Sequence, residues 1–205
     1  MNYHLYSNAI IVKSNLTTVA QQMTKQDIYF ESKDYNHLLV LHFDNIDKNK
    51  GYVSVVNNTH LLPADSRRIV DYAVDFFLLD GYMILFTASP STALQSLLRI
   101  RECFPDFRYE IIKHPIEQDA ATTHFIENFI HTKLKYDKII ELTLDSFFGF
   151  KVLFRKESKA KMVKYYTNGL VQFGMHNDKK HIEDICRFII NLDLTYKKEK
   201  DLLSV

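Results

Sequence analysis

Residues 147–174 read FFGFKVLFRKESKAKMVKYYTNGLVQFG and determine how the C-terminal half of the chain folds. Their alternation of apolar and polar side chains predicts strands over 148–154 and 161–166. The charged run 155–159 lies between the two strands and has the composition of a turn. We therefore expect an antiparallel pair of strands here.

A second turn signal follows at Asn168-Gly169. Asn-Gly strongly indicates a β-hairpin, because both residues tolerate the positive φ angles that a tight turn needs. It leads into a short strand over 170–173, which Gly174 ends. Apolar residues then recur at helical spacing over 182–192, which predicts an amphipathic helix. The whole stretch is thus a three-stranded meander followed by a helix.

The rest of the chain carries further strand and helix signals. Its predicted strands are 10–13, 28–31, 37–43, 52–56, 82–87, 107–113 and 139–144. Its predicted helices are 15–25, 65–77, 89–101 and 119–134. Together these elements predict an α+β protein, built of antiparallel sheets with helices packed on one face.

The order of the predicted elements recurs. Residues 37–78 and residues 148–190 both give strand, charged turn, strand, turn, short strand and helix, although few residues are identical between them. This recurrence suggests a pseudo-duplicated module, with an N-terminal α+β half over 1–106 and a C-terminal α+β half over 107–205. One continuous domain is the other arrangement that this length permits.

Composition narrows the class of protein. The chain has 205 residues, 46% of them hydrophobic, which is typical of a packed globular protein. No apolar run approaches the roughly 20 residues that a membrane-spanning helix needs, and the N-terminus has no signal-peptide pattern. Cys103 and Cys186 lie far apart in sequence and are expected to be buried free thiols. These features predict a cytoplasmic protein that does not bind a membrane.

Positive charge is concentrated in the C-terminal half. Although the net charge is +1, residues 107–205 carry 17 basic and 14 acidic side chains, against 9 and 11 in residues 1–106. The basic cluster within 151–164 consists of Lys151, Arg155, Lys156, Lys159, Lys161 and Lys164. Strand alternation places Lys159, Lys161 and Tyr165 on one face, where they can contact phosphates and stack on bases. The alternative is a solvated edge strand that its lysines protect from aggregation.

One stretch resembles a known family. It consists of the run Lys161-Met-Val-Lys-Tyr-Tyr-Thr-Asn-Gly-Leu-Val-Gln-Phe-Gly174 and the helix predicted after it. Residues 137–192 resemble the TATA-binding-protein-like repeat, which also occurs as an accessory domain in ribonuclease HIII and in the ribonuclease LS toxin family. The resemblance implies a meander-and-helix module associated with nucleic acids. The N-terminal half has Asn57-Asn58 in place of the x-Gly hairpin, so duplex bending by a paired saddle is not carried over.

The sequence leaves three functions open. The first is a non-catalytic binding protein of a bacterium or mobile element, which contacts nucleic acid or a nucleic-acid-processing partner through the basic hairpin. The second is a protein-interaction, inhibitory or oligomerisation module. The third is a metal-dependent nuclease or nucleotidyltransferase using Asp44 and Asp47, because metal-binding carboxylates often follow a strand in such enzymes. No cofactor or catalytic motif is evident, so we lean towards the non-catalytic interpretations.

Overall fold

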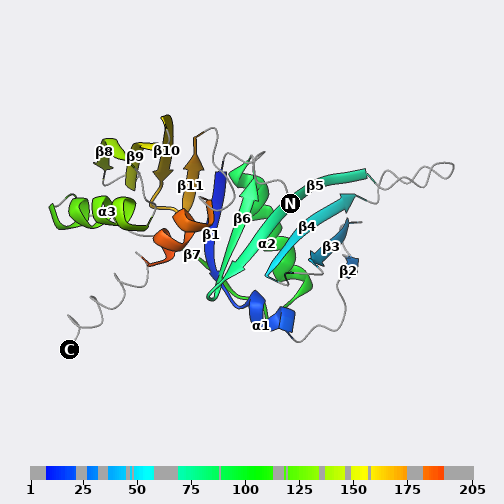
Figure 1. Ribbon diagram of the computed structural model, residues 1–205. Coiled ribbons are helices and arrows are strands. Elements are labelled where there is room, and N and C mark those ends of the chain that lie inside the picture. The colour runs from blue at the N-terminus through cyan, green and yellow to red at the C-terminus, as the bar shows by residue number, and fades with distance from the viewer. Residues whose placement is uncertain are drawn as a thin grey trace, which may run out of the picture. The chain divides into compact units, whose positions relative to one another are not determined.

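The computed structural model describes residues 8–21, 27–31, 37–44, 47, 49–57, 69–87, 89–112, 118, 120–133, 137–145, 149–156, 158–174 and 182–191 (Figure 1). The chain forms two compact units. Unit 1 spans Val12–Glu110, and unit 2 spans Ile111–Val205 together with the N-terminal Asn2–Ile11. Strand β1 (Asn8–Ser14) therefore contributes its first residues to unit 2 and its last residues to unit 1.

The elements are divided between the two units as follows. Unit 1 holds α1 (Leu16–Gln21), β2 (Asp27–Glu31), β3 (His37–Phe43), β4 (Lys50–Asn57), β5 (Ile69–Leu79), β6 (Tyr82–Thr87), α2 (Pro90–Cys103) and most of β7 (Tyr109–Ile111). Unit 2 holds α3 (Ala120–Lys133), β8 (Lys138–Asp145), β9 (Gly149–Lys156), β10 (Lys159–Tyr165), β11 (Leu170–Phe173) and a helix over 182–191.

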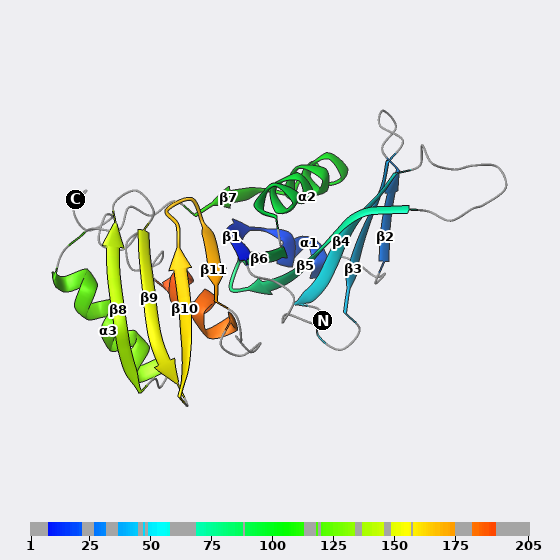
Figure 2. The ribbon, with the colours of Figure 1, turned by 90° about the horizontal axis from the view of Figure 1, so that it is seen from above.

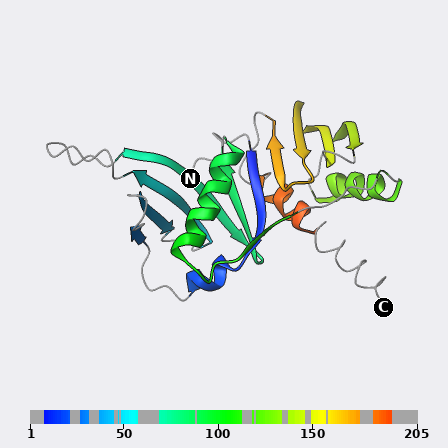
Figure 3. The same cartoon turned by 180° about the vertical axis from the view of Figure 1, so that it is seen from behind.

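Unit 1 is an antiparallel meander covered by a helix. Its strands lie in the order β2-β3-β4-β5-β6-β1, and each pair from β2 to β6 is antiparallel. Helix α2 packs across strands β3 to β6 (Figure 3). Its buried side chains Ala93, Leu97 and Ile100 recur at helical spacing, so one stripe of the helix lies in the core.

Strand β5 corrects the sequence-based expectation of a helix over 65–77. Residues 69–79 form an 11-residue strand that pairs with β4 and β6. Val74 is buried, Asp75 is half-buried, and residues 76–79 are all buried, which is the pattern of a strand covered on both faces near its end. The apolar residues of this segment fit the helical period of about 3.6 residues as well as the strand period of about 2, but valine and aromatic residues favour a strand. Strand β4 pairs with residues 69–77 of β5, and β6 pairs with residues 75–79, so tertiary pairing supports the strand along its length.

Unit 2 is a second meander, with strands in the order β8-β9-β10-β11-β1. Figure 2 shows β8 to β11 in front, with α3 and the helix of 182–191 behind them. The face towards the helices is apolar, and the side chains buried there from β9, β10 and β11 include Phe150, Val152, Phe154, Val163, Tyr165, Val171 and Phe173. Phe188 of the second helix meets Phe150 at a ring distance of 6.0 Å and Phe125 of α3 at 6.1 Å. Aromatic contacts thus join both helices to the strands.

The α+β class expected from the sequence is confirmed: the strands are antiparallel, and helices cover a face of each meander. The pseudo-duplication stays a prediction. So does the division into halves after residue 106, because compact units are not by themselves independently folding domains. Among the described residues no helix is long and apolar enough to cross a membrane. Neither thiol is bonded in a disulfide; Cys186 is buried, whereas Cys103 is half-buried.

Candidate functional site

The hairpin of β9 and β10 carries most of the basic cluster. Its register pairs Lys156 with Lys159 at the turn and Phe150 with Tyr165 at the far end. Because side chains alternate along a strand and directly paired residues share a face, this register fixes which of the basic residues lie together. Phe150, Val152 and Phe154 are buried against the helices. Lys151, Leu153 and Arg155 consequently lie on the opposite face.

We call that opposite face of unit 2 the open face. The residues that alternation and register place on it are Lys138, Glu141, Thr143, Asp145, Lys151, Leu153, Arg155, Ala160, Met162, Lys164, Tyr166, Leu170 and Gln172. All of these are half-buried or exposed. Among the described residues, the helices of unit 2 pack on the other side of the strands (Figure 2). These side chains are therefore at least partly accessible to solvent in the described part of unit 2.

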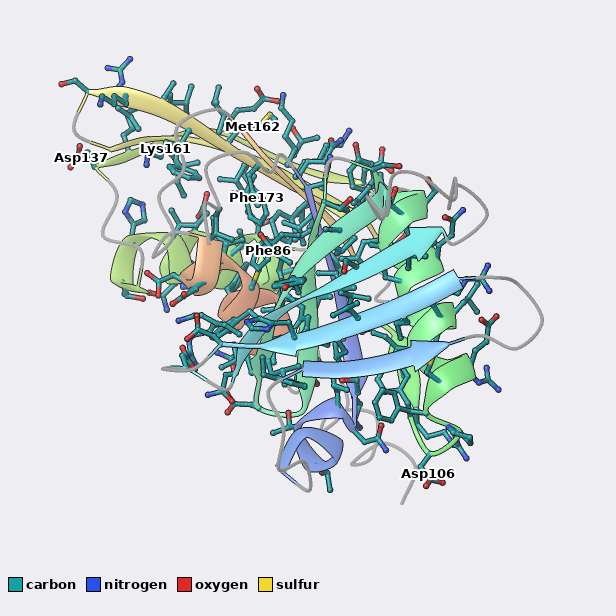
Figure 4. All side chains as sticks on the ribbon, turned by 90° about the vertical axis from the view of Figure 1, so that its right-hand side faces the viewer. Phe86, Asp106, Asp137, Lys161, Met162 and Phe173 are labelled. Atoms are coloured by element: carbon teal, nitrogen blue, oxygen red, sulfur yellow. The ribbon has the colours of Figure 1, made fainter. Side chains whose placement is uncertain are left out.

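Lys161 and Tyr165 correct the expected exposed face. Lys161 is only 7% exposed and Tyr165 is 0% exposed. Tyr165 packs against Phe150 with ring centroids 5.5 Å apart. Figure 4 shows Lys161 on the side of the strands that faces the helices. The sequence correctly predicted that Lys161 and Tyr165 share a face, but that face is the buried one. Val163 alternates with them on the same face and belongs to the core.

The other members of the cluster divide into two groups. Lys151, Arg155 and Lys164 share the open face. Lys159 is exposed near the hairpin turn. It lies two residues before Lys161 and therefore on the face of β10 that is turned towards the helices. Lys156 ends β9, and its side chain lies outside the described residues. The structure therefore brings together three of the six expected cations.

The centre of the open face holds two lysines directly opposite one another. Lys151 and Lys164 are cross-strand partners in the β9–β10 register. Like charges in this position repel and destabilise a sheet. The Lys151 ammonium donates to Glu141 Oε1 at 2.9 Å, and the Lys164 ammonium lies 4.7 Å from the centre of the Tyr166 ring. Each lysine thus has a compensating contact of its own, a carboxylate for Lys151 and an aromatic ring for Lys164.

Glu141 is held as an anion by these neighbours. The hydrogen bond from Lys151 is the largest cause that lowers the pKa of the Glu141 carboxyl, and a hydrogen bond from Thr143 Oγ1 at 3.0 Å adds to it. The carboxylate is exposed, so water and salt weaken its attraction to Lys151. A ligand phosphate can compete with Glu141 for the Lys151 ammonium.

Tyr166 and Gln172 are functional candidates that the sequence reasoning missed. The Tyr166 hydroxyl donates to Gln172 Oε1 at 2.8 Å across the β10–β11 hairpin. Tyr166 follows β10 directly, and its backbone N–H donates to Leu170 O at 2.8 Å. The available signal was alternation: once Val163 and Tyr165 are assigned to the core, Lys164 and Tyr166 must share the other face.

The carboxylates proposed for metal-dependent chemistry lie in a turn of unit 1. The Asp47 N–H donates to Asp44 Oδ1 at 3.0 Å, as in turns organised by an aspartate side chain. Asp47 Oδ2 pairs with the Lys50 ammonium at 2.5 Å, and this contact is the main cause that lowers the pKa of Asp47. These contacts at Asp44, Asp47 and Lys50 are those of a polar turn. Among the described residues no group of three or more acidic, histidine or cysteine side chains is arranged to hold a metal.

Comparison with protein-family models and with curated proteins gave no match.

Proposed function

We propose that the open face of unit 2 binds nucleic acid. The observation that carries this proposal is the pair Lys151 and Lys164, directly opposed in the middle of a face that the described helices of unit 2 do not cover, with Arg155 four residues beyond Lys151 on the same face of β9. A sheet built only for stability would avoid two facing ammonium groups. Bound phosphates attract both ammonium groups and offset their repulsion. The release of counterions from the nucleic acid adds to the binding free energy.

The length and setting of these side chains suit phosphate contacts. Lys151 is 34% exposed, so part of its stem packs on the sheet while its ammonium reaches solvent. Arg155 is exposed near the end of β9 and can donate two parallel hydrogen bonds to one phosphate. The three cations thus lie on adjacent strands within one continuous patch.

The element order supports the resemblance to the TATA-binding-protein-like repeat. Unit 2 runs helix, four-stranded meander, helix, and β1 lies beside the last strand of the meander. Unit 1 runs helix, five-stranded meander, helix, and β1 again lies beside the last strand. We propose on this ground that both units are copies of one such module.

Neutralisation of the lysine pair tests the proposed function. We expect Lys151→Gln/Lys164→Gln to weaken oligonucleotide binding about 10-fold or more at about 50 mM salt, because two phosphate contacts are lost. Thermal stability should change little, because the substitution removes the repulsion between the lysines together with two weak contacts, Lys151 with Glu141 and Lys164 with the Tyr166 ring. Fluorescence anisotropy with labelled DNA and RNA oligonucleotides measures the affinity.

The matched control is Lys13→Gln/Arg101→Gln, which removes the same net charge from two exposed positions of unit 1. An equal loss of affinity in both double variants would mean that general positive charge, rather than the open face, attracts the oligonucleotide. Unchanged affinity in the Lys151/Lys164 variant would reject the site.

A further inference from the structure

We infer that the open face selects single-stranded over double-stranded nucleic acid by stacking a base on Tyr166. This inference rests on the proposed function. It adds a chemical reason for the ligand class, namely an aromatic ring fixed beside the phosphate-binding lysines.

The Tyr166 ring is held at both ends. Its backbone N–H donates to Leu170 O at 2.8 Å, and its carbonyl accepts from Gly169 N at 2.9 Å. Its hydroxyl donates to Gln172 Oε1 at 2.8 Å. The ring is half-buried, so it remains partly accessible from the open face. A ring anchored in this way loses little further freedom when a base stacks on it.

Lys164 couples base stacking to phosphate binding. Its ammonium lies 4.7 Å from the Tyr166 ring centre in the free protein. A base that stacks on the ring competes with this cation–π contact, which is weak at exposed sites. The displaced ammonium is then available to the phosphate attached to that base. One nucleotide therefore stacks its base on the Tyr166 ring and places its phosphate near the Lys164 ammonium.

A double helix cannot use this arrangement. Its bases are stacked on one another, so it presents phosphates and groove edges rather than free base faces. A single strand can place successive bases on aromatic side chains while its phosphates follow a positive surface. Along one strand of the sheet, Lys164 and Tyr166 are two residues and thus about 6.8 Å apart. This step suits an extended single strand.

The chain contains no tryptophan, which permits a direct optical test. In Tyr166→Trp, the single indole should be quenched in a saturable manner by a 15-nucleotide oligo(dT) or oligo(U), with the same midpoint that anisotropy gives. A 15-base-pair duplex should bind more weakly and quench little. Separate oligo(dT) and oligo(U) titrations show whether the 2′-hydroxyl contributes.

Two sets of variants separate stacking from structure. Tyr166→Phe keeps the ring and should bind oligo(dT) within about twofold of the unaltered protein, whereas Tyr166→Ala should lose roughly 5- to 140-fold. Tyr52→Trp is the matched optical control, because Tyr52 is half-buried in unit 1 and already stacks on His42 at 4.7 Å. Its emission should not respond to the oligonucleotide.

The outcomes distinguish this inference from the proposed function. Oligonucleotide binding that depends on Lys151 and Lys164, but without quenching of Trp at position 166 and with equal affinity for duplex, would overturn base stacking and leave the phosphate site intact. Absence of binding to oligo(dT), oligo(U) and duplex at low salt would overturn both.

Discussion

At the scale of single residues, Glu141 is the carboxylate that pairs with Lys151 on the open face. Its carboxylate accepts from Lys151 at 2.9 Å and from Thr143 at 3.0 Å, and its lowered pKa keeps it charged at neutral pH. It therefore competes with any phosphate for the Lys151 ammonium. A solvent-exposed ion pair of this kind is weak, so the competition is modest.

We expect Glu141→Gln to tighten oligonucleotide binding about twofold to fivefold, because Lys151 is then available to phosphate. The salt dependence should become slightly steeper, since Lys151 is no longer shared with a carboxylate of the protein. Anisotropy titrations at several salt concentrations measure both quantities. The effect should be absent in a Lys151→Gln background, and persistence there would contradict a mechanism that acts through Lys151.

The residue scale also shows where sequence reasoning failed. Alternation correctly separated Lys161 and Tyr165 from Lys164 and Tyr166, but it could not tell which set faces the helices. Both sets contain lysine and tyrosine, so hydrophobicity barely distinguishes them. The helix contributing Phe188 decides the matter, because it packs against Phe150, which is the cross-strand partner of Tyr165. That contact is long-range and leaves no local signal.

At the scale of elements, the start of β9 depends on one glycine. Gly149 has a φ of +101°, and a Cβ at this position would lie 2.5 Å from the carbonyl oxygen of Tyr165. Gly81, in the tight turn between β5 and β6, has a φ of +81° but no atom within 4 Å of such a Cβ. The two positions thus share a backbone conformation that would strain any residue with a Cβ, but they differ in available space.

We expect Gly81→Ala to cost about 1 kcal/mol of unfolding free energy, from the strained backbone alone. Gly149→Ala should cost more, about 2–4 kcal/mol, because the β9–β10 pairing must also shift to relieve the clash. Chemical denaturation followed by circular dichroism measures both variants. Equal costs would show that the approach to Tyr165 does not constrain the pairing.

Element types were mostly readable from the sequence, with one instructive exception. Strands β9, β10 and β11 follow from local signals and occur as expected, and a hairpin forms at Asn168-Gly169. Of these two residues only Gly169 has a positive φ, +83°, and its N–H donates to Tyr166 O at 2.9 Å, so Thr167 and Asn168 are the central residues of the turn. Strand β5 does not follow from local signals, because its apolar residues satisfy helical and strand periods together. Pairing with both β4 and β6 favours the strand, and this depends on residues distant in sequence.

At the scale of the whole molecule, the small net charge of +1 conceals the arrangement that matters for function. Acidic and basic residues nearly balance over the chain, so non-specific attraction to polyanions is weak. The open face instead concentrates Lys151, Arg155 and Lys164 on one side of unit 2. Sequence could locate this cluster but could not divide it between two faces.

The dependence of affinity on salt tests the central claim most directly. For a 15-nucleotide oligo(dT), three cations that each release about 0.7 counterion predict a slope of about −2 for log K against log salt. Affinity should then fall roughly 15- to 20-fold between about 50 and 200 mM salt. A slope near zero, or no binding at about 50 mM salt, would contradict the claim that the open face binds nucleic acid through these phosphate contacts.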